Sequence, residues 1–213
     1  MPIRAVVFDV GETLVDETRN WGSMADWLGI PHFTFFAAMG AVVERRWHHR
    51  RVFELAAPGR DMEAEFARRR AAGWRYRFEP GDFYPDALPC LRDLRAAGYR
   101  VGLAGNQPEE AEGALAEAQV PADFIASSAR WGVEKPSPEF FSKVVAAAGV
   151  PAAEIAYVGD RLDNDVLPAG EAGMTSVFIR RGPWGFIHAG WPEAARADHR
   201  IDSLAELPAL LGR

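Results

Sequence analysis

Five short apolar stretches, separated by segments with helical periodicity, constrain the fold of this chain more than any other feature. The first is Ala5–Phe8, and the others cover residues 99–104, 124–126, 155–158 and 175–179. The β-branched run Ala5–Phe8 is typical of a strand buried on both faces of a sheet. Strands that alternate with helices are joined by right-handed crossovers. We therefore predict an α/β fold with a parallel sheet that helices cover on both faces.

The segment 17–80 interrupts this alternation, because it has helical periodicity and no convincing strand. Phe36, Gly40, Val43 and Trp47 recur there at three- and four-residue spacing, which indicates a helix with one buried face. After Pro58-Gly59, Met62, Phe66 and Arg69 continue the same spacing. The sequence thus predicts an α/β core of residues 1–16 and 81–213 and a small helical domain of residues 17–80. Most aromatic residues of the insert are expected in its core, with one or two lining a pocket.

The charge of the chain is unevenly distributed. The net charge is −6, but residues 17–80 carry 11 Lys/Arg against 8 Asp/Glu. A solvated helix face rich in arginine is the common explanation for such a bias, and a positive surface that attracts a small anion is the functional alternative. The pI of about 5.4 and the lack of a basic stretch interleaved with aromatic residues argue against a nucleic-acid partner.

Composition also bears on location. The first residues do not resemble a signal peptide, and no window approaches the ~18 apolar residues that a membrane span needs. The single cysteine, Cys90, allows no disulfide within the chain and suits a reducing compartment. We expect a cytoplasmic protein with no membrane partner, either a monomer or a homodimer.

Polar residues follow the predicted strands. Asp9, Asn106 and Asp160 come at or directly after strand ends, and Lys135 follows the third strand. Taken alone, Asp9 is explained equally well as a turn residue. However, the carboxyl ends of parallel strands share one edge of the sheet, where open α/β sheets bind ligands. We therefore expect these four side chains to converge.

Two carboxylates beside each other repel unless a cation lies between them. Mg²⁺ prefers oxygen ligands and would polarise a phosphoryl group. Lys135 would neutralise a nucleophile and the transferring oxygens, and an aspartate can attack phosphorus to give an aspartyl-phosphate. The four residues together indicate phosphoryl chemistry.

Four segments resemble the motifs of the haloacid dehalogenase-like (HAD) superfamily, in the right order: residues 8–14 (FDVGETL), 105–106 (GN), 135–138 (KPSP) and 159–165 (GDRLDND). The resemblance implies a Rossmann-like core with strand order 5-4-1-2-3. An insert after the first strand is similar to the helical cap of the subclass with a C1-type cap. The family further implies a cap that opens and closes, Mg²⁺, and mostly hydrolysis of small phosphate esters.

The resemblance also assigns roles. Asp9 corresponds to the nucleophile and a metal ligand, and the other metal ligands would be the backbone carbonyl of Gly11, Asp160 and, through water, Asp165. Thr13 would orient the nucleophile, Lys135 corresponds to the motif lysine, and Asn106, with Gln107 beside it, would bind the substrate anion. Asp163 is expected to be a surface or helix-cap acid.

Two positions depart from the family pattern. Gly11 stands where family phosphatases have the aspartate that protonates the leaving group and then activates water, and Glu12 stands where they have glycine. Gly105 replaces a serine or threonine, so one phosphate hydrogen bond is lost or passes to Asn106 or Gln107. Loss of general acid catalysis costs ~10² to 10⁴ in rate. Good leaving groups, or an acid such as Glu12 or Glu17, would reduce that cost.

Three functions remain open at this point. The leading one is a Mg²⁺-dependent phosphatase for a small phosphorylated metabolite, with weak activity unless something replaces the missing acid. A catalytically weak binding or regulatory protein with this fold is the second. The third is hydrolysis of a carbon–halogen bond, for which Gly11 would be no defect but the pair Asp160 and Asp165 would be unneeded.

Overall fold

The structure, a computed structural model, describes residues 2–212. Its chain divides into two compact units. The core unit consists of residues 1–16 and 77–213, and the inserted unit consists of Glu17–Tyr76. The role of the inserted unit as a cap stays a prediction.

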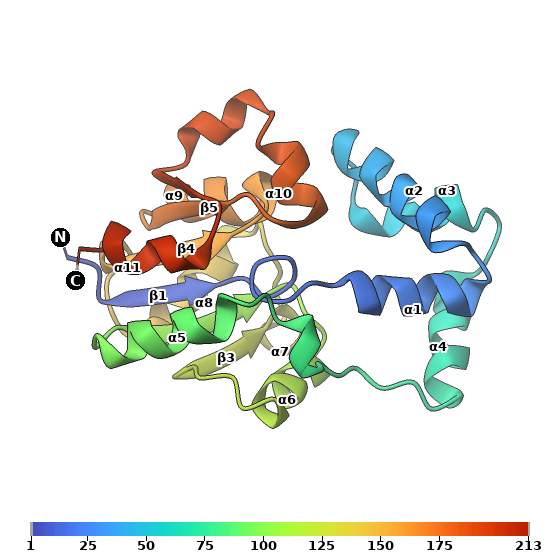
Figure 1. Cartoon of the computed structure of the whole chain (residues 1–213), viewed down its shortest axis with the longest axis horizontal. Coiled ribbons are helices and arrows are strands. Elements are labelled where there is room, and N and C mark those ends of the chain that lie inside the picture. The colour runs from blue at the N-terminus through green and yellow to red at the C-terminus, as the bar shows by residue number, and fades with distance from the viewer. Residues whose placement is uncertain (1, 213) are drawn as a thin grey trace. The chain divides into compact units, whose positions relative to one another are not determined.

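The core unit is built on one parallel sheet with the strand order β3-β2-β1-β4-β5-β6 (Figure 1). Its strands are β1 (Ala5–Phe8), β2 (Arg100–Gly105), β3 (Phe124–Ser127), β4 (Ile155–Gly159), β5 (Thr175–Ile179) and β6 (His199–Ile201). The predicted α/β class and the order 5-4-1-2-3 are confirmed. The edge strand β6 was not predicted, because it has three residues and follows a stretch rich in Gly, Pro and Trp.

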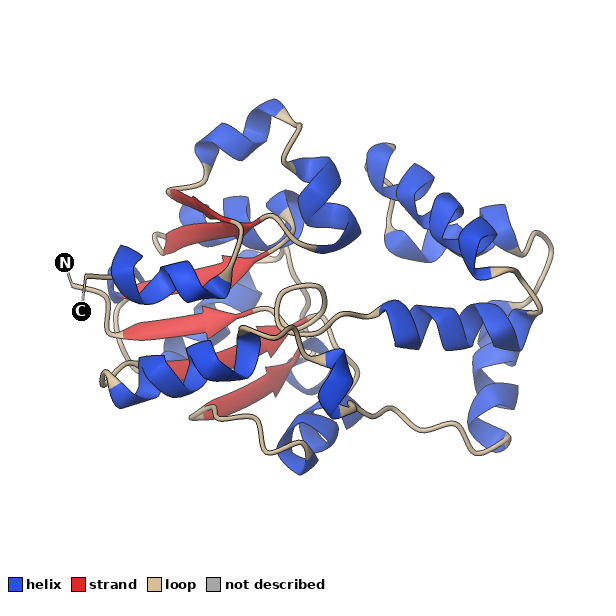
Figure 2. Cartoon of the chain, in the orientation of Figure 1, coloured by secondary structure: helices blue, strands red, loops and turns tan. Residues whose placement is uncertain are grey.

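Helices cover both faces of this sheet (Figure 2). Those of the core unit are α5 (Ala87–Ala96), α6 (Glu110–Glu117), α7 (Ser128–Trp131), α8 (Pro138–Ala148), α9 (Leu167–Glu171), α10 (Gly182–His188) and α11 (Leu207–Leu210). The side chains of β1 alternate between two apolar clusters: Val6 and Phe8 pack with α5 and α11, while Ala5 and Val7 pack with α8. All four side chains are fully buried. The strand β1 is therefore held firmly in the middle of the sheet, and this determines the position of Asp9, the next residue.

The inserted unit is helical, with α1 (Thr18–Leu28), α2 (His32–Glu44), α3 (Val52–Ala56) and α4 (Met62–Ala71). Of the predicted stripe of α2 only Val43 is buried, and the rest was wrong by about one residue, because the other buried side chains are Phe35, Met39 and Val42. Trp47 lies beyond the helix end. The helix has apolar residues on most of its circumference, so periodicity alone did not locate the buried face.

No single helix among residues 2–212 has the length and hydropathy of a membrane span. The pair α1 and α2 meets that test only when both helices are joined across a bend of 115°.

Candidate active site

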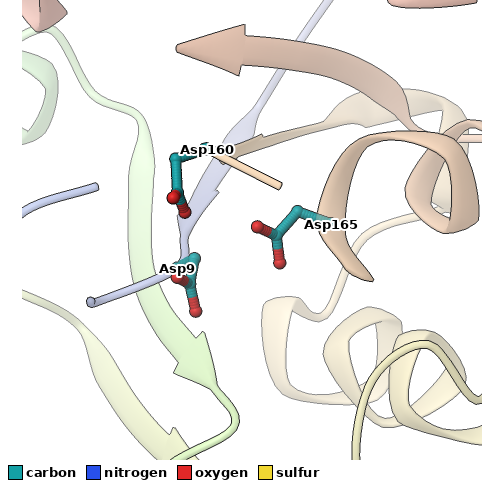
Figure 3. Close-up of side chains that lie close together, drawn as sticks. All are labelled: Asp9, Asp160 and Asp165. Carbon is teal, nitrogen blue, oxygen red and sulfur yellow. The ribbon is translucent and has the colours of Figure 1, made fainter. Parts of the chain in front are cut away.

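Three buried aspartates meet at the carboxyl edge of the sheet. Asp9 follows β1, Asp160 follows β4, and Asp165 lies in the π-helical turn η4 (Leu162–Val166). Carboxylate oxygens from all three lie within 4.8 Å of one another (Figure 3). The backbone N–H of Asp9 donates to the carbonyl of Val158 at 2.9 Å, which extends the pairing of β1 and β4 by one residue. The register of the two central strands therefore places Asp9 beside Gly159, and Asp160 follows one residue later at the same edge.

Lys135 joins two of these carboxylates. Its Nζ donates to Oδ1 of Asp9 and to Oδ1 of Asp165, both at 2.6 Å, and its side chain is 2% exposed. Burial alone would lower the pKa of Lys135, but the charges of Asp165 and Asp9 outweigh it and raise that pKa well above the usual value. The ammonium group is therefore positively charged in the folded protein.

The cluster fits a divalent cation. Three carboxylates and one ammonium group leave two negative charges without compensation, and Oδ2 of Asp160 is buried with no hydrogen-bond partner among the described residues. Burial, and then the charges of Asp165 and Asp9, raise the pKa of Asp160 well above its ordinary range, and burial raises the pKa of Asp165 to about 6. A hard cation with oxygen ligands would remove this repulsion and satisfy the orphaned oxygen.

The loop after β1 carries two further predicted residues. Gly11 forms an isolated bridge with Val15. The role of its backbone carbonyl as a metal ligand stays a prediction. The hydroxyl of Thr13 donates to Oδ1 of Asp160 at 3.4 Å, so it contacts the predicted metal ligand rather than Asp9.

Glu12 has a positive φ of 57°, a conformation that favours glycine. Its Oε2 accepts a hydrogen bond from the hydroxyl of Tyr84 at 2.7 Å. The same carboxylate packs against Gly182, where an added Cβ would lie 2.3 Å from Oε2. The side chain of Glu12 therefore fits at this position because Gly182 has no side chain there. The Glu12 carboxylate is hydrogen-bonded to Tyr84.

Arg181 supports this loop and was missed by the sequence analysis. Its Nη1 donates to the carbonyl of Thr13 at 3.0 Å, and its guanidinium group lies 4.2 Å from the ring centre of Tyr84. The other end of the guanidinium group pairs with Asp86. Its position two residues after β5, at the same sheet edge as Asp9 and Asp160, was the available signal.

The side chain of Asn106 forms two hydrogen bonds with the backbone of Lys135. Its side-chain Nδ2 donates to the carbonyl of Lys135 at 2.9 Å, and its Oδ1 accepts from the backbone N–H of Lys135 at 2.8 Å. One amide N–H remains for another acceptor. Gln107 shares this turn, and its backbone carbonyl accepts from the hydroxyl of Ser128 at 3.4 Å.

Two glycines make room for the carboxylates. A Cβ on Gly105 would lie 2.6 Å from Oδ1 of Asp9, and a Cβ on Gly159 would lie 2.5 Å from the carboxyl carbon of Asp165. With Asp9 in this position, the side chain of a serine or threonine at position 105 would clash with Oδ1 of Asp9. Asp163 points elsewhere and pairs with Arg161 at 2.7 Å, with half of its side chain exposed.

Comparisons with known proteins agree with the fold and identify the family. The family model described as haloacid dehalogenase-like hydrolase matches residues 3–173. A phosphoglycolate phosphatase of Cupriavidus necator is 32% identical over 99% of this chain and 94% of its own length. A glyceraldehyde 3-phosphate phosphatase of Methanopyrus kandleri is 40% identical, but the match covers 47% of this chain and 45% of that relative. The chain spans about half the length of the archaeal relatives of this name that it matches.

A solved structure shows the same similarity over the whole chain. The crystal structure of a HAD phosphatase from Thermococcus onnurineus superposes with a TM-score of 0.63 and 26% identity, covering 99% of this chain and 98% of that one. The parallel sheet, with three buried carboxylates at its carboxyl edge, defines the class of the chain as an α/β protein with an acidic site. Within it, this chain belongs to the haloacid dehalogenase-like hydrolase family.

Proposed function

We propose that this chain is a Mg²⁺-dependent phosphatase that hydrolyses a small phosphorylated metabolite through an aspartyl-phosphate intermediate. The observation that carries the proposal is the buried cluster of Asp9, Asp160 and Asp165. Lys135 lies between two of its members, and Oδ2 of Asp160 has no hydrogen-bond partner within residues 2–212. The names of two relatives, a phosphoglycolate phosphatase and a glyceraldehyde 3-phosphate phosphatase, support a small phosphate ester as substrate.

Asp9 is the proposed nucleophile. Lys135 holds its Oδ1 at 2.6 Å, so Oδ2 keeps its lone pairs for attack on phosphorus. The new bond joins Oδ2 to phosphorus, and the bond between phosphorus and the ester oxygen breaks. Water then attacks the same phosphorus, which releases inorganic phosphate and restores the Asp9 carboxylate. The charge of Lys135 opposes the negative charge that gathers on the phosphoryl oxygens.

Asp9, Asp160, the backbone carbonyl of Gly11 and, through water, Asp165 would hold the metal ion. When bound, Mg²⁺ supplies charge neutralisation and alignment of the phosphoryl group. Thr13 would fix the orientation of Asp160, which it contacts. Asn106 would hold Lys135 in place and offer its remaining amide N–H to the phosphoryl group, together with Gln107.

The proton of the leaving group has no assigned donor. Gly11 has no side chain, and the Glu12 carboxylate accepts a hydrogen bond from Tyr84. Esters whose leaving group is stable as an anion are therefore expected to react fastest. The proposal further includes a cytoplasmic location, a monomeric or homodimeric state, and a role of residues 17–80 as a cap that selects the substrate.

A screen of phosphorylated metabolites, with Mg²⁺ or with EDTA, tests this function. We expect phosphate release with Mg²⁺ only, and none from Asp9→Asn. The matched control is Asp93→Asn, because Asp93 is an exposed aspartate of α5. Full activity of Asp9→Asn would exclude the mechanism. Binding of phosphate and Mg²⁺ without turnover would favour the regulatory alternative. Halide release from 2-chloropropionate in EDTA would favour the dehalogenase.

A further inference from the structure

The inserted unit contains a cavity of about 180 Å³ that lies wholly within Glu17–Tyr76. Aromatic side chains form much of its wall: Trp21, Phe53, Phe66 and Trp74. Three arginines line it as well, Arg50, Arg69 and Arg70, of which only Arg69 is buried, and no carboxylate does so among the described residues. An apolar pocket with a few convergent polar groups is the usual form of a small-molecule site.

Arg69 is the unusual member of this cavity. The residue is 6% exposed, yet no carboxylate of the described chain lies within ion-pair distance of its guanidinium group. Burial lowers the pKa of Arg69, because it removes water from the charged guanidinium group. Buried charges in proteins are generally paired, because an uncompensated one is costly.

The nearest acid on the same helix does not compensate Arg69. Glu65 lies one turn earlier on α4, but its carboxylate pairs with Arg68 and Arg60 and accepts from the indole N–H of Trp27. Arg68 is thus explained as the partner of an acid, and the exposed Arg70 as a solvated residue near a helix C-terminus. Neither explanation applies to Arg69.

The guanidinium group of Arg69 is held in one orientation. Its Nη2 donates to the hydroxyl of Ser23 at 2.6 Å, its Nη1 contacts the sulfur of Met24 at 3.5 Å, and its plane lies 4.2 Å from the ring centre of Trp74. A guanidinium group has five N–H donors, so three remain for a ligand. A fixed fork of donors matches the planar, bidentate carboxylate group.

We propose that this cavity binds the carboxylate of a small organic acid, with Arg69 as its counterion and the aromatic side chains around its carbon chain. The volume corresponds to about six water molecules at ~30 Å³ each, which suits an acid of two to four carbons. A carboxylate monoanion matches Arg69, the one buried arginine of the lining, while Arg50 and Arg70 are exposed to solvent. The proposal does not rest on the phosphatase function, because it concerns the inserted unit alone.

Calorimetry and tryptophan fluorescence on the full chain test this binding. The Asp9→Asn variant in EDTA is used, so that the carboxylate cluster of the core unit does not contribute. We expect saturable binding of propionate and none of propionamide, its neutral analogue. Arg69→Met should weaken propionate binding by ~10-fold or more, and Arg69→Lys, which keeps the charge but loses the fork, by less.

Arg68→Met is the matched control, because Arg68 is the adjacent residue, pairs with Glu65 and does not line the cavity. It should bind propionate like the parent protein. Ser23→Ala tests the orientation of Arg69 without removing the charge and should weaken binding severalfold. Absence of propionate binding, equal binding by Arg69→Met, or tighter binding of inorganic phosphate than of propionate would overturn the proposal.

Discussion

The two units of this chain each bury a cation, and the surroundings of the two cations are opposite. Lys135 in the core unit donates to Asp9 and Asp165, and a third carboxylate, Asp160, lies beside them. Arg69 in the inserted unit has a hydroxyl, a sulfur and an aromatic ring around it, and no carboxylate of residues 2–212 lies within ion-pair distance of it. The core site therefore has an excess of negative charge, and the cavity of the inserted unit has an excess of positive charge.

This difference indicates what each site would bind. A buried charge that the protein does not compensate raises the free energy of the folded state, and a ligand of opposite charge lowers it. The core cluster thus favours a cation, and the inserted unit favours an anion. Replacing each cation with methionine, which keeps a similar volume, measures the two cases on one scale.

Lys135→Met should have the largest effect on stability. It leaves two buried carboxylates without their partner, and breaking a buried ion pair in this way costs ~3–5 kcal/mol. The free energy of unfolding, measured in urea and EDTA, should fall by that amount. The control is Lys143→Met, which replaces the only other lysine of the sequence, a residue of α8 that forms no ion pair with any residue that the structure describes. Equal losses in both variants would show that Lys135 is not the counterion of the cluster.

The effect of a divalent metal on stability should depend on pH. The pKa values of Asp160 and Asp165 are raised in the folded protein, the latter to about 6. A raised pKa means that these acids contribute stability below about pH 4, their unfolded range, and that this contribution is lost as the pH rises through their raised pKa values, about 6 for Asp165. The metal-free protein should therefore lose stability over this range.

Metal binding needs the ionised carboxylates, so stabilisation by Mg²⁺ should be small at pH 5 and full at pH 8. At 100 times Kd it amounts to ~2.7 kcal/mol. Thermal unfolding at several pH values, with Mg²⁺ or EDTA, measures this difference. Asp160→Asn should abolish it. A shift in Tm that is the same at pH 5 and pH 8 would contradict the assignment of these carboxylates as ligands.

Much of the core could be predicted from the sequence, because central strands are short apolar runs and their polar successors must share one edge. The convergence of Asp9, Lys135 and Asp160 follows from this rule. The hydrogen bonds of Asn106 to the backbone of Lys135, and the fit of Glu12 against Gly182, join residues that are 29 and 170 positions apart. They depend on three-dimensional packing that no local pattern encodes.

The inserted unit was less predictable for a related reason. Its helices are apolar on several sides, so the buried face of α2 was misplaced by about one residue. The Arg68-Arg69-Arg70 run could be recognised as basic, but only the packing distinguishes Arg69, which is buried, from its exposed neighbours. A charge pattern in the sequence therefore predicts whether a surface is positive or negative, but it does not show which charged side chain is buried.

Gly11→Asp tests whether the core site lacks an acid as well as a cation. Gly11 does not have a positive φ, so the backbone accepts an aspartate. The variant should raise kcat/KM for alkyl phosphates by ~10-fold, part of the full contribution of a general acid, because no other group orients the new carboxyl. The rate for 4-nitrophenyl phosphate should change little. The control is Gly11→Asn, because asparagine has the shape of aspartic acid but no acidic proton to transfer to the leaving group. An equal gain in Gly11→Asn would exclude acid catalysis.

Arg69→Met should have the smallest effect on stability, within ~1 kcal/mol, although it removes a buried charge as Lys135→Met does. It gives up the hydrogen bond to Ser23 and the contact with Trp74, but it also relieves an unpaired guanidinium group of its desolvation cost. Urea unfolding of Arg69→Met beside Arg68→Met and Lys135→Met, without any organic acid, gives the comparison directly. A loss of ~3 kcal/mol or more for Arg69→Met would mean that the protein already compensates this charge, and the contrast between the two units would fail.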